Sequence, residues 1–434
     1  MSAGSLAARV RAEATPRSIF RVDFGRVAER TNPSDLGFCC STYGSTPIDL
    51  PSQAEAERRL DARLVRVPIA IKNGLLDSGA GGRAAGLDMR RLVDWYRENG
   101  FCVYATLSGR TNDLDYRAGD ATFVARRLGF EGIEYGSINE PNNHGIKVEG
   151  VVEVARQTLE DLRRVDAKAR LWGPEWTWFD AGDLKRFAGA MGQGLAGISF
   201  HHYAMGVESL STAKAMAMTP DWGREVAQVR ADLRDLGLPE RVGVTELNLS
   251  WRYADGTAPD GKNRRFYSAE ETAWVASVCG HILRNGGRAL VYGSQNGALG
   301  VWNQNTDQDD EFKRPQSAPM PAYWGLAAWT GARLWPHFAD RFWNVSTPDK
   351  EREVELFAVA NERRGANLVL INKSEQPRAV EVATHGQAPG HRLQVWTSDP
   401  RQPFDAPRPS PSAPLRAAWM AQLPPFSVAV AVIS

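Results

Sequence analysis

Eight short apolar or β-branched runs recur along the chain, and segments with the period of a helix separate them. The runs are residues 36–44, 62–71, 100–109, 132–140, 169–175, 197–203, 241–248 and 288–294. In the segments between them, apolar residues return every three or four positions, as in an amphipathic helix. Strands that alternate with helices favour a parallel sheet, and eight such units predict a closed (β/α)8 TIM barrel.

An open, doubly wound parallel sheet is the alternative arrangement for such an alternation. That fold usually carries a glycine-rich phosphate-binding loop after its first strand. The sequence at the end of the first predicted strand and beyond it, CCSTYGSTPID, has no such pattern. We therefore predict the barrel.

The last hundred or so residues change character. Beyond residue 332, alternating stretches separated by turn-rich segments replace the helical pattern, which predicts a small antiparallel β-sandwich. The early stretch SIFRVDFGRV precedes the first barrel strand and is expected to join that sheet. The predicted domains are an N-terminal segment that adds a strand to the β-sandwich (1–35), a catalytic barrel (36–332) and a β-sandwich accessory domain (333–434).

The composition narrows the class of protein. The 434 residues contain 52 Lys and Arg against 51 Asp and Glu, so no bulk charge points to nucleic acid or an anionic membrane as a partner. The N-terminus lacks the apolar core of a signal peptide, and no apolar run reaches the length of a membrane span. We expect a cytoplasmic protein, or a secreted or periplasmic one if a leader has been removed. The sequence leaves the oligomeric state open.

Two carboxylates follow strands on opposite sides of the predicted barrel. Glu140, in GSINEPNN, ends the fourth strand, and Glu246, in VTEL, ends the seventh. Because catalytic groups of such barrels lie at the C-terminal strand ends, the two should face each other across the mouth. Cleavage of a glycoside by two carboxylates needs this layout. One protonates the leaving oxygen, and the other attacks the anomeric carbon from about 5–5.5 Å away when configuration is retained.

Other strand ends carry polar side chains. Arg66 is expected to keep a neighbouring carboxylate ionised, or to form an ordinary structural ion pair. Tyr203 is expected to donate its hydroxyl to the nucleophile, or to be a rim aromatic. Adjacent residues on a strand point to opposite faces, so His201 should point inward with Tyr203 and His202 outward among the helices. The two histidines cannot share a metal ion, and we predict no metal site and no cofactor.

The remaining substrate-binding candidates are an amide, a carboxylate and a group of aromatics. Asn139 is expected to hydrogen-bond the substrate 2-hydroxyl, and Glu175 ends the fifth strand. Aromatic residues follow strands five, seven and eight: Trp176, Trp178, Trp251, Tyr253 and Trp302. A single tryptophan in such a place is more often packing than a sugar platform, but five on one rim predict at least one platform.

Three of these motifs together resemble a known group of enzymes. Asn139-Glu140-Pro141, HHY at 201–203 and TEL at 245–247 resemble the strand-four, strand-six and strand-seven signatures of retaining glycoside hydrolases of clan A. The resemblance runs through the barrel and into the terminal β-sandwich. It implies that Glu140 is the acid/base and Glu246 the nucleophile of a double displacement.

Within the clan, two families share further motifs. NEPN, GPE, FHHYAMG, PMPAYWGLAAWTG and LPPFSVAVAVI are similar to family 79, the heparanase and β-glucuronidase group. That family carries a Tyr-Gly-Gly element that helps hold the sugar carboxylate, where this chain has Trp251-Arg252-Tyr253; Arg252 is the candidate to bind a carboxylate instead. TELNLSW also resembles family 39, the β-xylosidase and α-iduronidase group, which usually has Trp where this chain has Ile138.

The leading hypothesis is a retaining O-glycosidase whose partner is an oligosaccharide or glycoside, with a β-glucuronide or glycosaminoglycan-like glycan as the first candidate. The alternatives are a family 39-like enzyme for neutral sugars, a transglycosidase, and a non-catalytic glycan binder. The presence of both carboxylates argues against the binder. Since the acid must be protonated in the resting enzyme, the pKa of Glu140 is expected to lie above that of Glu246.

Overall fold

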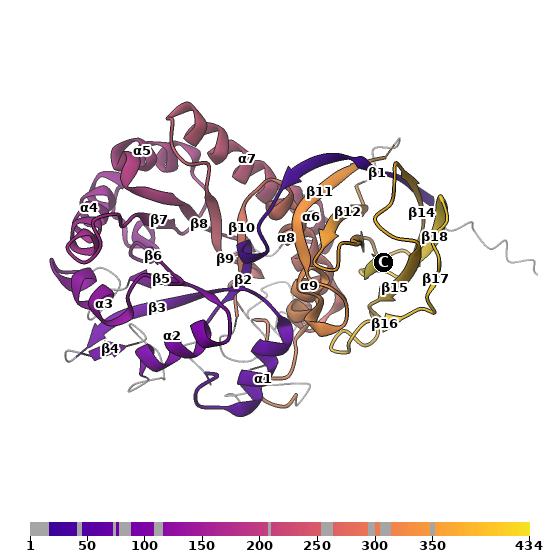
Figure 1. Ribbon diagram of the computed structural model, residues 1–434, viewed down its shortest axis with the longest axis horizontal. Coiled ribbons are helices and arrows are strands. Elements are labelled where there is room, and N and C mark those ends of the chain that lie inside the picture. Colours follow the sequence, from indigo (N-terminus) through magenta and orange to yellow (C-terminus); the bar gives the residue numbers. More distant parts are fainter. Residues whose placement is uncertain are drawn as a thin grey trace, which may run out of the picture.

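The structure is a computed structural model that describes residues 17–40, 46–72, 75–77, 88–107, 116–206, 210–252, 264–293, 300–303, 314–347 and 352–434. Two bodies lie side by side in it, a barrel with helices around it and a curled β-sheet (Figure 1). The N-terminal strand β1 (Arg17–Arg30) belongs to the curled sheet, and the chain then enters the barrel through a 3-10 turn (Pro33–Asp35).

The barrel is built from parallel strands that pair in chain order. They are β2 (Leu36–Cys39), β3 (Leu64–Lys72), β5 (Cys102–Leu107), β6 (Ile133–Gly136), β7 (Leu171–Trp176), β8 (Leu195–Met205), β9 (Val242–Ser250) and β10 (Arg288–Val291). Strand β2 pairs with both β3 and β10, which closes the ring, and β4 (Leu75–Asp77) adds an antiparallel partner to β3. The eight-unit barrel predicted from the sequence is confirmed.

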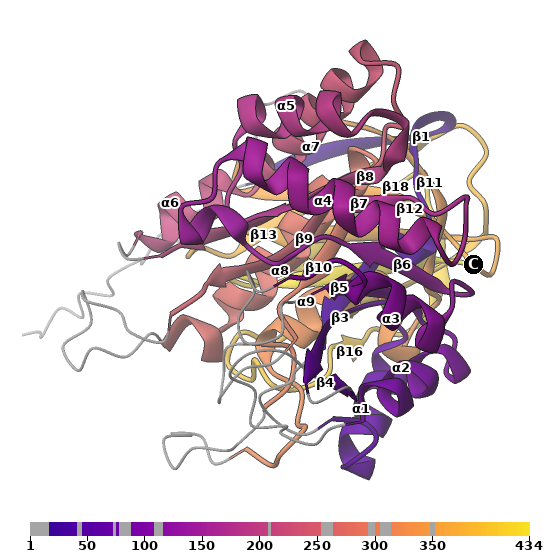
Figure 2. The same ribbon diagram turned by 90° about the vertical axis from the view of Figure 1, so that its left-hand side faces the viewer.

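Helices cover the outside of the barrel. They are α1 (Pro51–Leu60), α2 (Met89–Glu98), α3 (Asp120–Leu128), α4 (Val148–Arg163), α5 (Ala181–Met191), α6 (Thr212–Met218), α7 (Pro220–Asp235), α8 (Ala269–Arg284) and α9 (Pro321–Thr330). Figure 2 shows α3, α4 and α5 in front of the strands. Helix α2 illustrates why they form: Asp88 caps its first turn, and one face buries Leu92, Val93 and Tyr96.

A small hydrophobic cluster joins residues of five barrel strands, β2, β3, β5, β7 and β10. It contains Cys39, Leu64, Tyr104, Trp172 and Leu290, all buried. A side chain at Gly197 would meet the Trp172 ring at 2.4 Å, so a glycine is required beside that indole. Aromatic bulk below the mouth therefore leaves the polar side chains at the strand ends as the upper layer of the interior.

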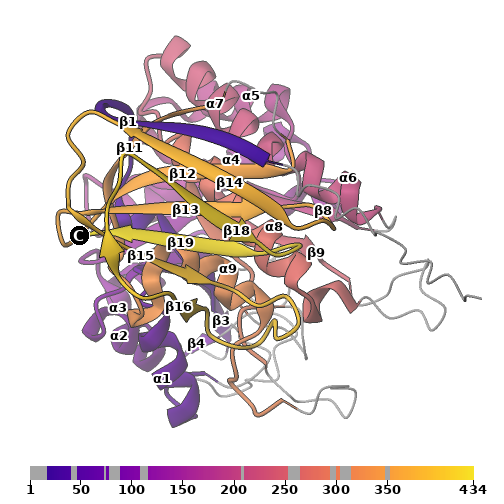
Figure 3. The ribbon, with the colours of Figure 1, turned by 90° about the vertical axis from the view of Figure 1, so that its right-hand side faces the viewer.

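The terminal domain is one curled sheet of ten strands (Figure 3). Besides β1 it contains β11 (Phe338–Ser346), β12 (Val354–Asn361), β13 (Ala366–Asn372), β14 (Arg378–His385), β15 (Arg392–Thr397), β16 (Arg408–Pro409), β17 (Ala413–Pro414), β18 (Ala418–Leu423) and β19 (Val428–Ile433). The N-terminal strand joins this sheet as predicted, between β11 and β14. Its pairing with β14 is parallel, whereas the sequence analysis expected antiparallel strands throughout.

The four cysteines are free thiols, and three of them are buried. No helix in the described ranges combines the length and the apolar character that a membrane span requires. The domain boundaries after residues 35 and 332 stay predictions.

Candidate active site

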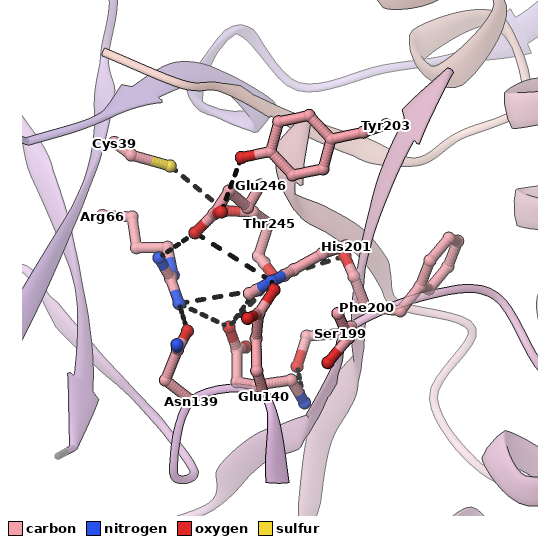
Figure 4. Close-up of polar contacts among 12 residues, drawn as sticks. Cys39, Arg66, Asn139, Glu140, Ser199, Phe200, His201, Tyr203, Thr245 and Glu246 are labelled. Carbon is pink, nitrogen blue, oxygen red and sulfur yellow. Dashed lines mark hydrogen bonds and ion pairs between the residues drawn. The ribbon is translucent and has the colours of Figure 1, made fainter. Parts of the chain in front are cut away.

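Side chains from five strand ends meet in one polar cluster at the C-terminal mouth of the barrel (Figure 4). Every member of the cluster was a candidate on sequence grounds, and they are Arg66, Asn139, Glu140, Glu175, His201, Tyr203 and Glu246. The closed ring of strands brings them together although up to 180 residues separate hydrogen-bonded partners in the chain.

Glu246, on β9, is held by two donors. Arg66 donates from Nη1 to Oε2 over 3.0 Å, and the Tyr203 hydroxyl donates to Oε1 over 2.6 Å. Burial disfavours the charge of Arg66, but the carboxylates of Glu175 and Glu246 outweigh burial and raise its pKa. Burial and the charge of Glu246 raise the pKa of Tyr203 well above its ordinary value, so its hydroxyl stays a donor. The two donors hold the carboxylate of Glu246 in a fixed position.

Glu140 follows β6 and is presented by a strained backbone. Its φ is 44°, in the left-handed region that non-glycine residues rarely adopt, and its amide donates to the Glu175 carbonyl over 3.1 Å. The side chain is partly exposed, and Oε1 lies 2.9 Å from Nδ1 of His201. One oxygen of Glu140 and one of Glu246 lie within 4.8 Å of each other.

The proton of the Glu140–His201 pair lies on the imidazole in the resting site. Burial raises the pKa of Glu140, but the hydrogen bond and charge of His201 outweigh burial and hold that pKa below its ordinary value. Burial opposes a charged His201, yet the charge of Glu246 and hydrogen bonds to Glu140 and Glu175 raise its pKa to about 9. The protonated Glu140 predicted from the sequence is therefore wrong, because the imidazole beside this carboxyl holds the proton of the pair.

The geometry at His201 favours proton chemistry over metal binding. Ligand-type atoms of Glu140, His201 and Glu246 lie within 4.8 Å of one another, close enough to share an ion. However, the two ring nitrogens of His201 lie 2.9 Å from Glu140 and 3.2 Å from Glu175, and a metal needs a ring nitrogen with a free lone pair. The neighbouring His202 points the other way, as predicted, and stacks on Trp222 of α7.

Three of the candidates lie beside the two carboxylates. Asn139 accepts a hydrogen bond from Arg66 and is half-buried. Glu175 is 0% exposed and hydrogen-bonds to His201 and Thr245, so its burial places it behind the site, in contrast to the predicted contact with a substrate. Arg66 is also buried and contacts Glu246, Glu175 and Asn139, which places it behind the carboxylates rather than against a sugar.

A pocket of about 490 Å³ opens over the two carboxylates. Its lining includes Glu140, Glu246, Tyr203 and two large aromatics, Trp178 and Trp251. These two indoles are 49% and 45% exposed, unlike most tryptophans of the chain, which are buried. Exposed indoles beside a polar pocket suit the apolar C–H faces of sugar rings.

Two other tryptophans are core residues, in contrast to the prediction that they lie on the rim. Trp176 is 2% exposed because β7 extends to it, and alternation along the strand turns it away from the interior that Glu175 faces. Trp302 is 1% exposed and packs edge-on against Phe38, with ring centroids 4.7 Å apart. Tyr253 lies outside the described residues.

Two tryptophan variants distinguish a residue that stacks on the substrate, Trp251, from a residue of the core, Trp302. Trp251→Ala should raise the KM for a glycoside about tenfold, since losing one aromatic contact to the sugar costs about 1–1.5 kcal/mol. The thermal midpoint of this variant should be nearly unchanged. Trp302→Ala should lower the free energy of unfolding by about 3–5 kcal/mol, because it leaves a cavity beside Phe38. Steady-state kinetics and denaturant unfolding of both variants test this. A stability loss in Trp251→Ala equal to that of Trp302→Ala would contradict the platform.

Comparisons with known proteins bear on the fold. No family model and no curated protein matches the chain. Solved structures resemble it over nearly its whole length. They include a family 51 arabinofuranosidase from Xanthomonas axonopodis pv. citri, with 13% identity, a TM-score of 0.71 and coverage of 96% of this chain and 100% of the other.

Two more of these structures are glycoside hydrolases of family 44. A xyloglucanase from Paenibacillus polymyxa is 12% identical with a TM-score of 0.67, covering 96% of this chain and 100% of its own. An endoglucanase from Clostridium thermocellum is 12% identical with a TM-score of 0.64, covering 97% and 100%. At such identities the likeness establishes a shared fold, a TIM barrel with an additional β domain. The resemblance to family 79 or family 39 stays a prediction.

Proposed function

We propose that the chain is a retaining O-glycoside hydrolase in which Glu246 is the nucleophile and Glu140 the acid/base. One observation carries the proposal: oxygens of the two carboxylates approach within 4.8 Å across the pocket. Retaining enzymes place the pair about 5–5.5 Å apart, whereas inverting enzymes need about 6.5–9.5 Å to fit a water molecule. The glycoside hydrolases that share the fold support the same class of reaction.

The contacts assign a role to each group in the two steps. In the first, Glu246 attacks the anomeric carbon while the bond to the leaving oxygen breaks. The one proton of the Glu140–His201 pair passes from the imidazole through Glu140 to that oxygen, which leaves Glu140 ionised and His201 neutral. In the second, Glu140 takes a proton from water as the water oxygen displaces Glu246 from the sugar. Arg66 and Tyr203 stabilise the charge on Glu246 before and after the ester exists.

The stereochemistry of the product tests this mechanism. An aryl glycoside panel of glucuronide, xyloside, glucoside, galactoside and arabinoside identifies the preferred sugar. Proton NMR of the first product formed from that substrate should show the same anomer as the substrate. A first product of opposite configuration would contradict the double displacement. Transfer of the sugar to an added alcohol acceptor would indicate the transglycosidase alternative, which uses the same residues.

The sugar is the less constrained part of the proposal. The named neighbours are enzymes for xyloglucan, arabinofuranosides and glucans, which favours a neutral sugar. The acidic-sugar candidate rests on Arg252, an exposed residue whose guanidinium lies 4.3 Å above the ring of the pocket residue Trp251.

An arginine variant distinguishes the two sugars. If Arg252 binds a uronate, Arg252→Ala should lower kcat/KM for a uronide about ten- to a hundredfold, the cost of one charge-assisted contact of about 1.5–3 kcal/mol. The matching neutral glycoside should be almost unaffected. Equal effects on both substrates, or no uronide activity in the unmodified enzyme, would remove the acidic-sugar candidate in favour of a neutral one.

A further inference from the structure

A third carboxylate, Glu175, lies beneath the proposed catalytic pair. It is 0% exposed, at the end of β7, and its φ of 57° is in the strained left-handed region. A buried carboxylate is costly unless ionic partners and hydrogen bonds compensate it. Glu175 has both kinds of partner. Burial opposes its ionisation, but His201 and Arg66 outweigh burial and lower the pKa of Glu175 to about 2. The site therefore contains a permanent buried negative charge that never meets the pocket.

The partners of Glu175 belong to both halves of the catalytic machinery. Oε2 lies 3.2 Å from Nη2 of Arg66, whose other terminal nitrogen holds Glu246. The same oxygen lies 3.2 Å from Nε2 of His201, whose other ring nitrogen contacts Glu140. One carboxylate oxygen thus links the cation behind the nucleophile to the imidazole behind the acid/base.

Further contacts fix the position of that oxygen. Thr245 donates its hydroxyl to Oε2 over 3.1 Å, and Tyr104 donates to Oε1. The backbone of Glu175 also contributes: its amide donates to Ser199 Oγ over 3.2 Å, and its carbonyl accepts the amide of Glu140. A side chain at Gly136 would lie 2.7 Å from the Tyr104 hydroxyl, so a glycine there keeps room for this donor.

We propose that Glu175 is a positioning residue for the proposed glycosidase site, whose buried charge aligns Arg66 with the nucleophile and keeps the imidazolium of His201 beside the acid/base. A neutral glutamine of the same shape would preserve the packing and remove the charge. The inference deepens the proposed function and rests on it for the catalytic role. The electrostatic link between Glu175 and His201 does not depend on activity.

Among the described residues, four charged groups face His201 and enter the expected pH dependence. They are Glu140 after β6, Glu175 on β7, Glu246 on β9 and Arg66 on β3, and the three carboxylates favour the imidazolium while the guanidinium opposes it. Together the four groups raise the pKa of His201 to about 9, so the Glu140–His201 pair should lose its proton as the pH rises through that value. Removal of one carboxylate must lower that pKa.

Glu175→Gln is the direct test. In kinetics, kcat/KM should fall about ten- to a hundredfold, the usual loss for an outer partner of an active-site group, with KM little changed. The basic limb of the pH profile should move down by about one unit, since a neighbouring carboxylate at this distance shifts a pKa by about 1–3. In NMR of histidine-labelled protein, with the signal assigned by His201→Asn, His201 should titrate correspondingly lower, even if no glycoside is cleaved.

A matched control and a second variant keep the test decisive. Glu134→Gln also removes a largely buried carboxylate paired with two arginines, Arg241 and Arg288, and should leave the titration of His201 unchanged. If Glu175→Gln does not fold, Thr245→Val is the second variant. It removes one hydrogen-bond donor from Oε2 of Glu175, so this oxygen should stabilise the imidazolium of His201 more strongly. The basic limb of the pH profile should then move upward. A titration of His201 that is unchanged by Glu175→Gln, or a lowered titration with an unchanged pH profile, would overturn the proposal.

Discussion

Replacement of Glu246 by alanine is expected to reduce turnover by more than about 10⁴-fold, the scale of loss when a covalent catalyst loses its nucleophile. The reason is that the anomeric carbon can no longer form an ester with the protein. Steady-state kinetics on the best aryl glycoside measure the loss. Glu149→Ala, which changes an exposed glutamate on α4, should behave like the unmodified enzyme.

Azide distinguishes a missing nucleophile from a damaged pocket. The alanine variant leaves space beside the anomeric carbon, and azide in that space should attack it and restore activity. The product should be a glycosyl azide of inverted configuration, because only one displacement occurs. Activity restored by azide with retained configuration, or turnover that survives the substitution, would assign the nucleophile to another residue.

Glu140→Ala is expected to produce the second large effect, and its size should depend on the leaving group. Alkyl glycosides should lose about 10²–10⁴-fold in kcat/KM, the usual contribution of a general acid, since an alkoxide needs a proton to depart. Dinitrophenyl glycosides need little assistance and should still form the ester rapidly. Hydrolysis of that ester should then be slow, because the same carboxylate acts as the base, and a burst of dinitrophenolate should precede the steady state.

The two substrates must be compared in the same variant. Equal losses for dinitrophenyl and alkyl glycosides would show that Glu140 does not protonate the leaving group. A conservative Glu140→Gln variant supplies the control for shape, since it retains the side-chain volume beside His201. The glutamine variant should show the same dependence on the leaving group as the alanine variant.

The barrel and the two catalytic candidates were predictable from local sequence. Apolar runs bounded by helical segments determine the strand order, and a strand end places its last polar residue at the mouth. Glu140 and Glu246 needed no more than that rule to be found. The N-terminal strand was also predictable, because its alternating pattern matches the terminal sheet, although the parallel pairing with β14 depends on the path of the whole chain.

The features that the sequence did not predict depend on where a strand ends, to within one residue, and on contacts between distant parts of the chain. Trp176 follows Glu175 directly, so a strand one residue longer than predicted is enough to turn the indole into the core. The hydrogen bonds that compensate the buried Glu175 come from Tyr104 and Thr245, which lie on two other strands, β5 and β9. The low pKa of Glu140 likewise depends on His201, a partner 61 residues away.

Mass spectrometry of a trapped intermediate tests the central claim most directly. The protein is incubated with the 2-deoxy-2-fluoro, dinitrophenyl form of its best sugar, which forms the ester quickly and hydrolyses it slowly. We predict a mass increase of one fluorosugar and, after digestion, a label on Glu246 within the β9 peptide. A label on any other residue, or no label from a substrate analogue that still competes for the pocket, would contradict a double displacement through Glu246.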